Sequence, residues 1–479
     1  MAEPELTNHG SETPVEPGDP SDNDARETHF HLGAGEVEAI IDALESGRDQ
    51  EVRQLVAPLH FADAADLVER LSTEQRRELL ETASDILDPD FFTELDVTVR
   101  EEVVEIVGLD AVAEVIAELE TDDAIGIVEE LDDHDQRQVL DAIPAADRAL
   151  IEEGLAYPEY SAGRMMQRDV MTVPQFWSVG ETIDFMRDIA EQDEWSLPDA
   201  FYDIIVVDPR HVPVGTIALS VLLRHKRPTP VRDIMHERMK LIPASMDQED
   251  VAFLFRQRDL VSAPVVRDDG RLVGVITIDD VVDVIDEEAE DDILRLGGVK
   301  EDDLYSATLD TTKSRFSWLF LNLLTAILAS LVIGMFQGEI EQVVALAVLM
   351  PIVASMGGNA GTQTLTVAVR ALATKELTAN NAMRQIWKEL LVGGINGVVF
   401  AVVMGVVAWL WFSSPLLGVV IGLAMIANLI VAGLAGATIP IALERAGVDP
   451  AVSSSVFLTT VTDVVGFLVF LGLGGWLLM

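Results

Sequence analysis

The chain has 479 residues and a formal net charge of −50, although 49% of its residues are hydrophobic. A single compact domain rarely combines so much charge with so much apolar sequence, and this length allows three or more domains. The dense negative charge excludes nucleic acid as a partner, because the two would repel each other. The absence of cysteine excludes disulfides and thiolate metal sites.

The charge and the apolar sequence lie in different halves of the chain. From residue 311 onward seven acids are matched by seven bases, so the whole net charge lies in residues 1–310. The bases are six Lys and 26 Arg, and acids are abundant, which is typical of proteins from salt-accumulating organisms. Two interpretations stay open for the acidic half: a cation-binding surface, or adaptation to a cytoplasm in which salt screens the repulsion.

The N-terminal region begins with a polar segment and continues with helical patterning. Residues 1–33 lack the basic start and apolar core of a signal peptide, so we predict a disordered acidic tail. Residues 34–160 carry apolar positions at helical spacing and predict an all-α domain. Within it Ala62–Leu71 is echoed by Asp122–Leu131, which indicates stacked helical hairpins.

A clearer duplication follows in residues 161–226 and 227–289. Arg168–Met171 is matched by Arg232–Met235 in the second copy. Each copy reads as an opening turn, a helix, two β-branched strands joined by a turn, and a helix. The two copies together resemble a tandem CBS pair, an α/β module.

CBS pairs often bind adenine nucleotides in the cleft between their repeats. In the second copy, Thr277 and Asp280 are polar groups that could meet a ribose. The first copy has Ala218–Val221 at the matching place, so the resemblance allows one nucleotide site and requires none.

The C-terminal region, residues 313–479, contains stretches with the roughly 20 apolar residues that a membrane-spanning helix needs. Bases precede the first span and lie in the connections between the second and third spans and between the fourth and fifth, whereas the other two connections have none. Since Lys and Arg favour the cytoplasmic side, we predict a multi-pass plasma-membrane protein with its N-terminus inside and its C-terminus outside. An odd number of spans is awkward for a monomeric pore and predicts a dimer. The five predicted spans are 316–336, 342–370, 385–412, 416–443 and 452–478.

The second span contains helix-weakening residues. Pro351 removes a backbone donor, and three glycines between residues 357 and 361 predict an interruption of the helix. Close packing through small residues is the alternative for the glycines. The neighbouring Asn359, Thr362 and Gln363 favour a polar cavity, because irregular backbone at membrane depth needs water or protein around it.

The last span contains one carboxylate, Asp463. It lies about 12 residues into the span, roughly 18 Å along a helix and hence near mid-membrane. A charge there costs from about 3 to over 10 kcal/mol unless water, a cation or a proton meets it. A protonated Asp bonded to a neighbouring helix is the alternative. Ser455 and Thr459 share its helical face and Thr462 is adjacent, so we predict a wet polar stripe.

An acidic run, Asp279–Asp292, follows the second repeat and predicts a charged helix leading to the membrane. Like charges at helical spacing destabilise such a helix unless something cationic offsets them. Carboxylates in this number suit Mg²⁺ or Ca²⁺ and not a soft metal. The alternative is a solvated helix of a salt-adapted protein.

Taken together, the order of these parts resembles the MgtE family of Mg²⁺ channels over about residues 35–479. The segments that carry the resemblance are Tyr157–Met166, Pro351–Gln363 and Thr459–Asp463. Tyr160 departs from the family, which usually has an acid there. The resemblance implies a multidomain fold: a helical N domain, an α/β CBS pair, a connecting helix over 290–312, and a five-helix α transmembrane domain.

The resemblance also implies a function and its residues. The expected protein is a homodimer in the lipid membrane whose pore, between subunits, holds hydrated Mg²⁺ through Asp463 of both chains. Asn359 and the carbonyls around Gly357 and Gly358 would assist. Cytoplasmic Mg²⁺ would gate the pore from acidic sites between the N domain, the CBS pair and the connecting helix. The implied pore-lining residues are Ser455, Thr459, Thr462 and Thr362, and the regulatory ligands are Asp283, Glu288, Asp291, Asp292, Asp122 and Asp123.

Two other functions compete with this interpretation. An intramembrane enzyme is disfavoured, because Asp463 has no second catalytic Asp, HExxH motif or Ser/His pair beside it; we therefore predict that the protein is not an enzyme. A CBS-regulated transporter of another cation, such as Co²⁺ or Na⁺, is the remaining alternative. Chloride is disfavoured because the pore face is anionic.

Overall fold

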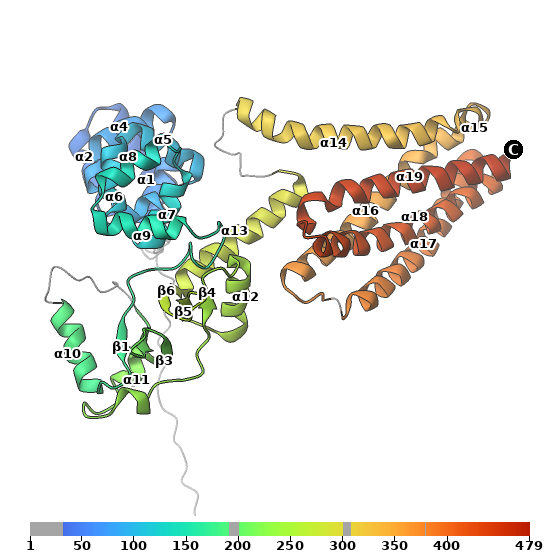
Figure 1. The fold of residues 1–479 in the computed structure, drawn as a ribbon. Coiled ribbons are helices and arrows are strands. Elements are labelled where there is room, and N and C mark those ends of the chain that lie inside the picture. The colour runs from blue at the N-terminus through green and yellow to red at the C-terminus, as the bar shows by residue number, and fades with distance from the viewer. Residues whose placement is uncertain (1–31, 191–200, 300–307, 379) are drawn as a thin grey trace, which may run out of the picture. The chain divides into compact units, whose positions relative to one another are not determined.

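The computed structural model describes residues 32–190, 201–299, 308–378 and 380–479. The chain forms two compact units, Met1–Ala156 and Tyr157–Met479 (Figure 1). The predicted tail lies outside the described residues except for its last two positions.

The first unit is helical throughout its described part, as predicted. Its apolar side chains form one continuous core, and two short 3₁₀ turns, Ser84–Ile86 and Pro89–Phe92, join the fourth and fifth helices. The α-helices are α1 (Ala34–Glu45), α2 (Asp49–Val56), α3 (Phe61–Arg70), α4 (Thr73–Ala83), α5 (Val97–Val107), α6 (Leu109–Ile116), α7 (Thr121–Glu130), α8 (Asp135–Ala142) and α9 (Ala145–Leu155).

The weak repeat corresponds to two equivalent helices, α3 and α7. Both contain 10 residues. Both end at a leucine with extended backbone, Leu71 and Leu131. The buried positions also match: Ala64, Ala65, Leu67 and Val68 in α3 correspond to Ala124, Ile125, Ile127 and Val128 in α7.

The second unit begins with two small sheets that confirm the duplication. Each has its first two strands parallel and the last two antiparallel. Asp203 pairs with Ala218 at the same register as Ser262 with Thr277, and both sheets carry an irregularity at the end of the middle strand. The elements are β1 (Thr172–Pro174), α10 (Val179–Ala190), β2 (Asp203–Val207), β3 (Pro213–Ala218), α11 (Leu219–Leu222), a 3₁₀ turn (Val231–Asp233), β4 (Ile242–Pro243), α12 (Gln248–Arg258), β5 (Ser262–Val266) and β6 (Leu272–Thr277).

The helix after the second repeat differs from the predicted 290–312. Helix α13 runs over Ile278–Gly297 and begins directly after β6, because Thr277 and Asp280 form a capping box at its start. It ends where Gly298 adopts a left-handed φ of 77°, a conformation that favours glycine. Part of the predicted segment lies outside the described residues, and Thr308–Thr312 belongs to the next helix.

Among the described residues of the C-terminal part, five helices are long and apolar enough to cross a membrane, and they lie close to the predicted spans (Figure 1). Helix α18 is the most buried of the five and α14 the least. A short helix, α15 (Gln337–Gln342), connects the first two. The long helices are α14 (Thr308–Gly334), α16 (Ala345–Ala373), α17 (Ala382–Phe412), α18 (Pro415–Arg445) and α19 (Pro450–Leu478).

The predicted interruption of the second span is wrong, because α16 is continuous from Ala345 to Ala373. Pro351 lies in the second turn of this helix and leaves only one carbonyl, that of Ala347, without its backbone donor, so the helix continues through it. Two of the glycines serve close packing. A Cβ on Gly357 would lie 2.2 Å from Asn428 Nδ2, and one on Gly361 would lie 2.7 Å from Leu458 Cδ1. Helix contact therefore explains these glycines, as the alternative interpretation held.

Candidate functional site

Helix α16 presents an exposed polar stripe along a membrane span. Ser355, Asn359, Thr362 and Thr366 recur every three or four residues and are all exposed in the single chain. Asn359 Nδ2 donates to Ser355 Oγ at 3.4 Å, and Thr366 Oγ1 donates to the Thr362 carbonyl at 3.0 Å. Because hydrocarbon cannot satisfy such groups, this face requires water or protein beside it.

The glycines divide between the two faces of α16. Gly357 is buried against Asn428, so its Cα side faces the interior of the helix bundle. A Cβ on Gly358 would meet no atom within 4 Å. Gly357 and Gly358 were both predicted to contribute to the pore, but only Gly358 faces open space.

On α19, Asp463 is half-buried, and so are Ser455 and Thr459. The Thr459 hydroxyl donates to the Ser455 carbonyl at 3.0 Å. Thr462 lies apart from this group: it is 0% exposed, and its hydroxyl donates to the Leu458 carbonyl at 3.1 Å. The structure thus brings Asp463, Ser455 and Thr459 to one partly open face and turns Thr462 inward.

A further carboxylate, Glu389 of α17, is buried inside the helix bundle. Its Oε2 accepts from Thr364 Oγ1 of α16 at 3.0 Å, and its Oε1 accepts from Gln385 Nε2 at 3.1 Å. Sequence reasoning counted Glu389 only as one of the seven acids from residue 311 onward. Its partner Thr364 lies on the buried face of α16, opposite the polar stripe.

Helix α13 concentrates carboxylates that resist ionisation. Burial, Asp279 and Asp286 raise the pKa of Asp283. Burial and two neighbouring acids also raise the pKa of Glu287. Such groups favour a bound proton or cation, because either removes uncompensated negative charge. Glu288, another predicted ligand, accepts from Gln248 Nε2 of α12 at 2.9 Å.

The end of α13 meets the start of α19 through charged groups. Arg295 donates to Asp291 at 2.6 Å and to Asp449 at 2.7 Å. Burial and then Asp449 raise the pKa of Asp292. Sequence reasoning missed Asp449, although its place directly before Pro450 at a helix start was a readable signal of a capping residue.

The first unit contains a compact acidic group at the start of α7. Carboxylate oxygens of Glu120, Asp122 and Asp123 lie within 4.8 Å of one another. Asp122 and Asp123 were predicted as regulatory ligands, and Glu120 was missed. Three hard oxygen donors at this separation suit a divalent cation such as Mg²⁺.

The cleft between the two repeats is narrow. Ser262 Oγ donates to Asp203 Oδ2 at 2.8 Å across it, and the cavity, which Thr277 lines, has a volume of about 20 Å³. That is space for about one water molecule. Asp280 is not among its lining residues; it accepts from the Thr277 hydroxyl at 2.8 Å instead, and burial raises its pKa to about 6.

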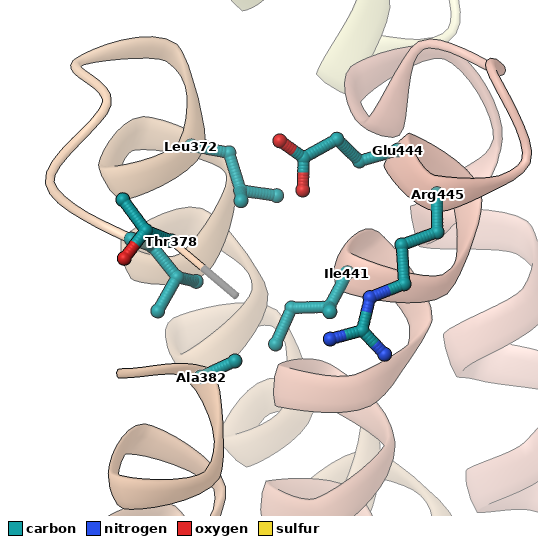
Figure 2. A pocket seen from close by; sticks show the side chains of 7 residues that line it. Leu372, Thr378, Ala382, Ile441, Glu444 and Arg445 are labelled. Atoms are coloured by element: carbon teal, nitrogen blue, oxygen red, sulfur yellow. The ribbon is translucent and has the colours of Figure 1, made fainter. Parts of the chain in front are cut away.

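A larger pocket, about 290 Å³, lies at the end of α18 near the α16–α17 connection (Figure 2). Glu444 points into it, and the Arg445 side chain runs along the wall beside Ile441. No predicted site residue lines this pocket. Its lining residues are Leu372, Leu377, Thr378, Ala382, Ile441, Glu444 and Arg445.

Comparisons with known families match three parts of the chain. Residues 350–473 match the family described as a divalent cation transporter, and residues 59–160 match the MgtE intracellular N domain. Residues 231–287 match the CBS domain. These matches agree with the predicted order of parts.

Curated relatives match most of the chain. The magnesium transporter MgtE of Bacillus subtilis is 30% identical over 441 residues, which is 91% of this chain and 95% of that protein. The magnesium transporter MgtE of Thermus thermophilus is 34% identical over 74% of this chain and 78% of its own length. A solved structure, described as the cytosolic domain of the Mg²⁺ channel MgtE in complex with ATP, is 27% identical. It covers 52% of this chain and 99% of its own, with a TM-score of 0.47.

Proposed function

Since the chain belongs to the MgtE family of magnesium transporters, we propose that it imports Mg²⁺ through a pore between two copies of itself. It is a multi-pass membrane protein and not an enzyme. The observation that carries the proposal is the exposed polar stripe of α16, Ser355 to Thr366. A second copy would cover this stripe and enclose water between the two chains.

Asp463 supplies the charge that this pore needs. Two copies would place two carboxylates beside one path, which favours a divalent cation over Na⁺ or K⁺. Mg²⁺ releases its water reluctantly, so it would be held through its hydration shell by polar groups such as Asn359 and the carbonyl of Gly358. Ser455, Thr459 and Thr362 would line the path. Gly357 and Thr462 contribute to packing instead, since both face the interior.

Cytoplasmic Mg²⁺ would close the pore by neutralising the acids of α13 and of the N domain. The raised pKa values of Asp283 and Asp292 support this, because burial and neighbouring acids make the charged forms costly and a bound cation would offset that cost. Asp449 joins Asp291 and Asp292 at the point where α13 meets α19, and Asp122 and Asp123 act with Glu120. At low Mg²⁺ the acids would repel one another and release the connecting helix from the pore.

The proposed orientation has the N-terminus in the cytoplasm and the C-terminus outside. Bases cluster at the α16–α17 connection, on the side where positive charge is favoured. In this connection Lys375 pairs with Asp250 of α12, so it lies on the side of the repeats. An adenine nucleotide could contact Thr277, but the narrow cleft would have to open first.

The test is divalent-cation flux into liposomes that contain the full chain or its Asp463→Asn or Asp463→Ala variant. We expect wild-type Mg²⁺ flux and a large loss in both variants. Unchanged Mg²⁺ flux in both variants would show that Asp463 is not the carboxylate of the pore. Co²⁺ or Na⁺ flux in place of Mg²⁺ flux would instead support the alternative transporter.

A further inference from the structure

The centre of the transmembrane part holds a polar side chain that the proposed function does not use. Asn428 of α18 is 1% exposed. Its Nδ2 donates to the Val353 carbonyl of α16 at 2.8 Å. Its Oδ1 has no hydrogen-bond partner in the described part of the chain. A buried acceptor left without a donor is costly in a membrane protein, so simple packing does not explain an Asn here.

Two glycines on different helices make room for this amide. A Cβ on Gly357 of α16 would lie 2.2 Å from Asn428 Nδ2, and a Cβ on Gly466 of α19 would lie 2.8 Å from the same atom. Backbone from two helices therefore meets one amide group from a third. The amide, held by its bond to the Val353 carbonyl, fills the space between α16 and α19.

We infer that Asn428 is a positioning residue for ion passage, which sets the separation of α16 and α19. The inference rests on the proposed function, since these helices carry Asn359 and Asp463. Gly466 lies three residues after Asp463, less than one helical turn. A change in what fills this space moves the Asp463 carboxylate relative to the α16 stripe. Because a hydrated cation is recognised by the width of its path, selectivity changes with that movement.

The experiment is a double-variant cycle between Gly466 and Asn428 in liposomes that contain the full chain. Gly466→Ala should push α19 away and lower Mg²⁺ flux by at least about tenfold, as small displacements in a functional site commonly do. Asn428→Ala removes the obstructing amide, so the double variant Gly466→Ala/Asn428→Ala should recover most of the lost flux. Gly472→Ala, on the same helix with its nearest atom at 3.9 Å, is the matched control and should behave as wild type.

Selectivity separates positioning from a merely structural role. The ratio of Mg²⁺ to Ca²⁺ flux should change in Gly466→Ala and return to the wild-type value in the double variant. The amount of folded dimer, measured by size-exclusion chromatography, should be the same in all of these proteins. Full flux with an unchanged ratio in Gly466→Ala would overturn the inference, as would a double variant no better than the worse single one. The proposed function fails separately, if the wild type carries no Mg²⁺ or Asp463→Asn has no effect.

Discussion

Arg295 of α13 donates to Asp449 at 2.7 Å, and the other Asp449 oxygen caps α19 by accepting from the Ala451 N–H at 2.7 Å. One carboxylate thus joins the acidic connecting helix to the helix that carries Asp463. The Arg295 guanidinium also pairs with Asp291, so it provides fixed positive charge where the acids would otherwise be compensated only by cations from solution.

Replacement of this guanidinium should make closure depend more strongly on Mg²⁺. In Arg295→Gln, the carboxylates of Asp291 and Asp449 lose their shared partner and repel each other. A partly exposed pair of this kind contributes on the order of 1 kcal/mol, equivalent to about fivefold in an equilibrium. We therefore expect about fivefold greater flux at low cytoplasmic Mg²⁺. Arg271→Gln, in an exposed turn of the second repeat, is the control, and equal flux in both variants would contradict the role of Arg295.

Salt should weaken the Mg²⁺ sensor. Repulsion between carboxylates is screened over about 10 Å at 0.1 M ionic strength but over about 3 Å at 1 M. A chain whose whole net charge of −50 lies in residues 1–310 is especially sensitive to this screening. We expect the dependence of flux on cytoplasmic Mg²⁺ to become shallower, with lower sensitivity, in concentrated KCl. A titration with the same midpoint in dilute and concentrated KCl would show that screening does not matter.

Asp280 should make stability depend on pH. Burial raises its pKa from 3.8 to about 6, so the folded state binds the proton more tightly than the unfolded state does. The folded protein is therefore favoured at low pH and loses stability as the pH rises from about 4 through 6. The loss is on the order of 3 kcal/mol at pH 7.5.

Asp280→Asn tests this directly, since an Asn oxygen still accepts from Thr277. We expect a higher Tm than wild type at pH 7.5 and no gain near pH 4, measured by thermal unfolding of the full chain in detergent. Asp268→Asn, at an exposed turn, is the control and should leave the Tm unchanged at both pH values. A gain for Asp280→Asn that persists near pH 4 would indicate an effect unrelated to charge.

Sequence reasoning identified features that stand out against their local surroundings. Asp463 is the only charge in its apolar span, and the spans and the duplicated repeats follow from composition and periodicity. Sequence reasoning failed where the position of a side chain depends on residues that are distant in the sequence. Thr462 is adjacent to Asp463, but one residue turns the helix by about 100°, so it faces inward.

The predicted helix break at Pro351 also rested on local sequence alone, whereas packing within the bundle keeps the helix continuous. Gly357 and Gly361 weaken an isolated helix, but within the bundle they allow Asn428 and Leu458 to approach. The role of Asn428 itself depends on Gly357 and Gly466, which lie far from it in sequence. No local pattern marks one amide within an apolar helix as the group that fills the space between two others.

The acidic group of the first unit should bind Mg²⁺ and stabilise the protein. A ligand that binds only the folded state raises stability by about 2.7 kcal/mol at 100 times its dissociation constant. In the double variant Asp122→Asn/Asp123→Asn, Glu120 remains as the single carboxylate of the group. We expect wild-type Tm to rise with Mg²⁺ and the double variant to lose part of that rise.

The control for this site is Asp110→Asn, an exposed acid at the start of α6 in the same unit, which lies outside the group of three. It removes one negative charge without removing a proposed ligand, so its Mg²⁺-dependent rise in Tm should equal that of wild type. If the control and the double variant lose the rise equally, Mg²⁺ acts through general screening of the acidic surface. If neither loses it, the Mg²⁺ that stabilises the protein is bound elsewhere, and the acids of α13 become the remaining candidates.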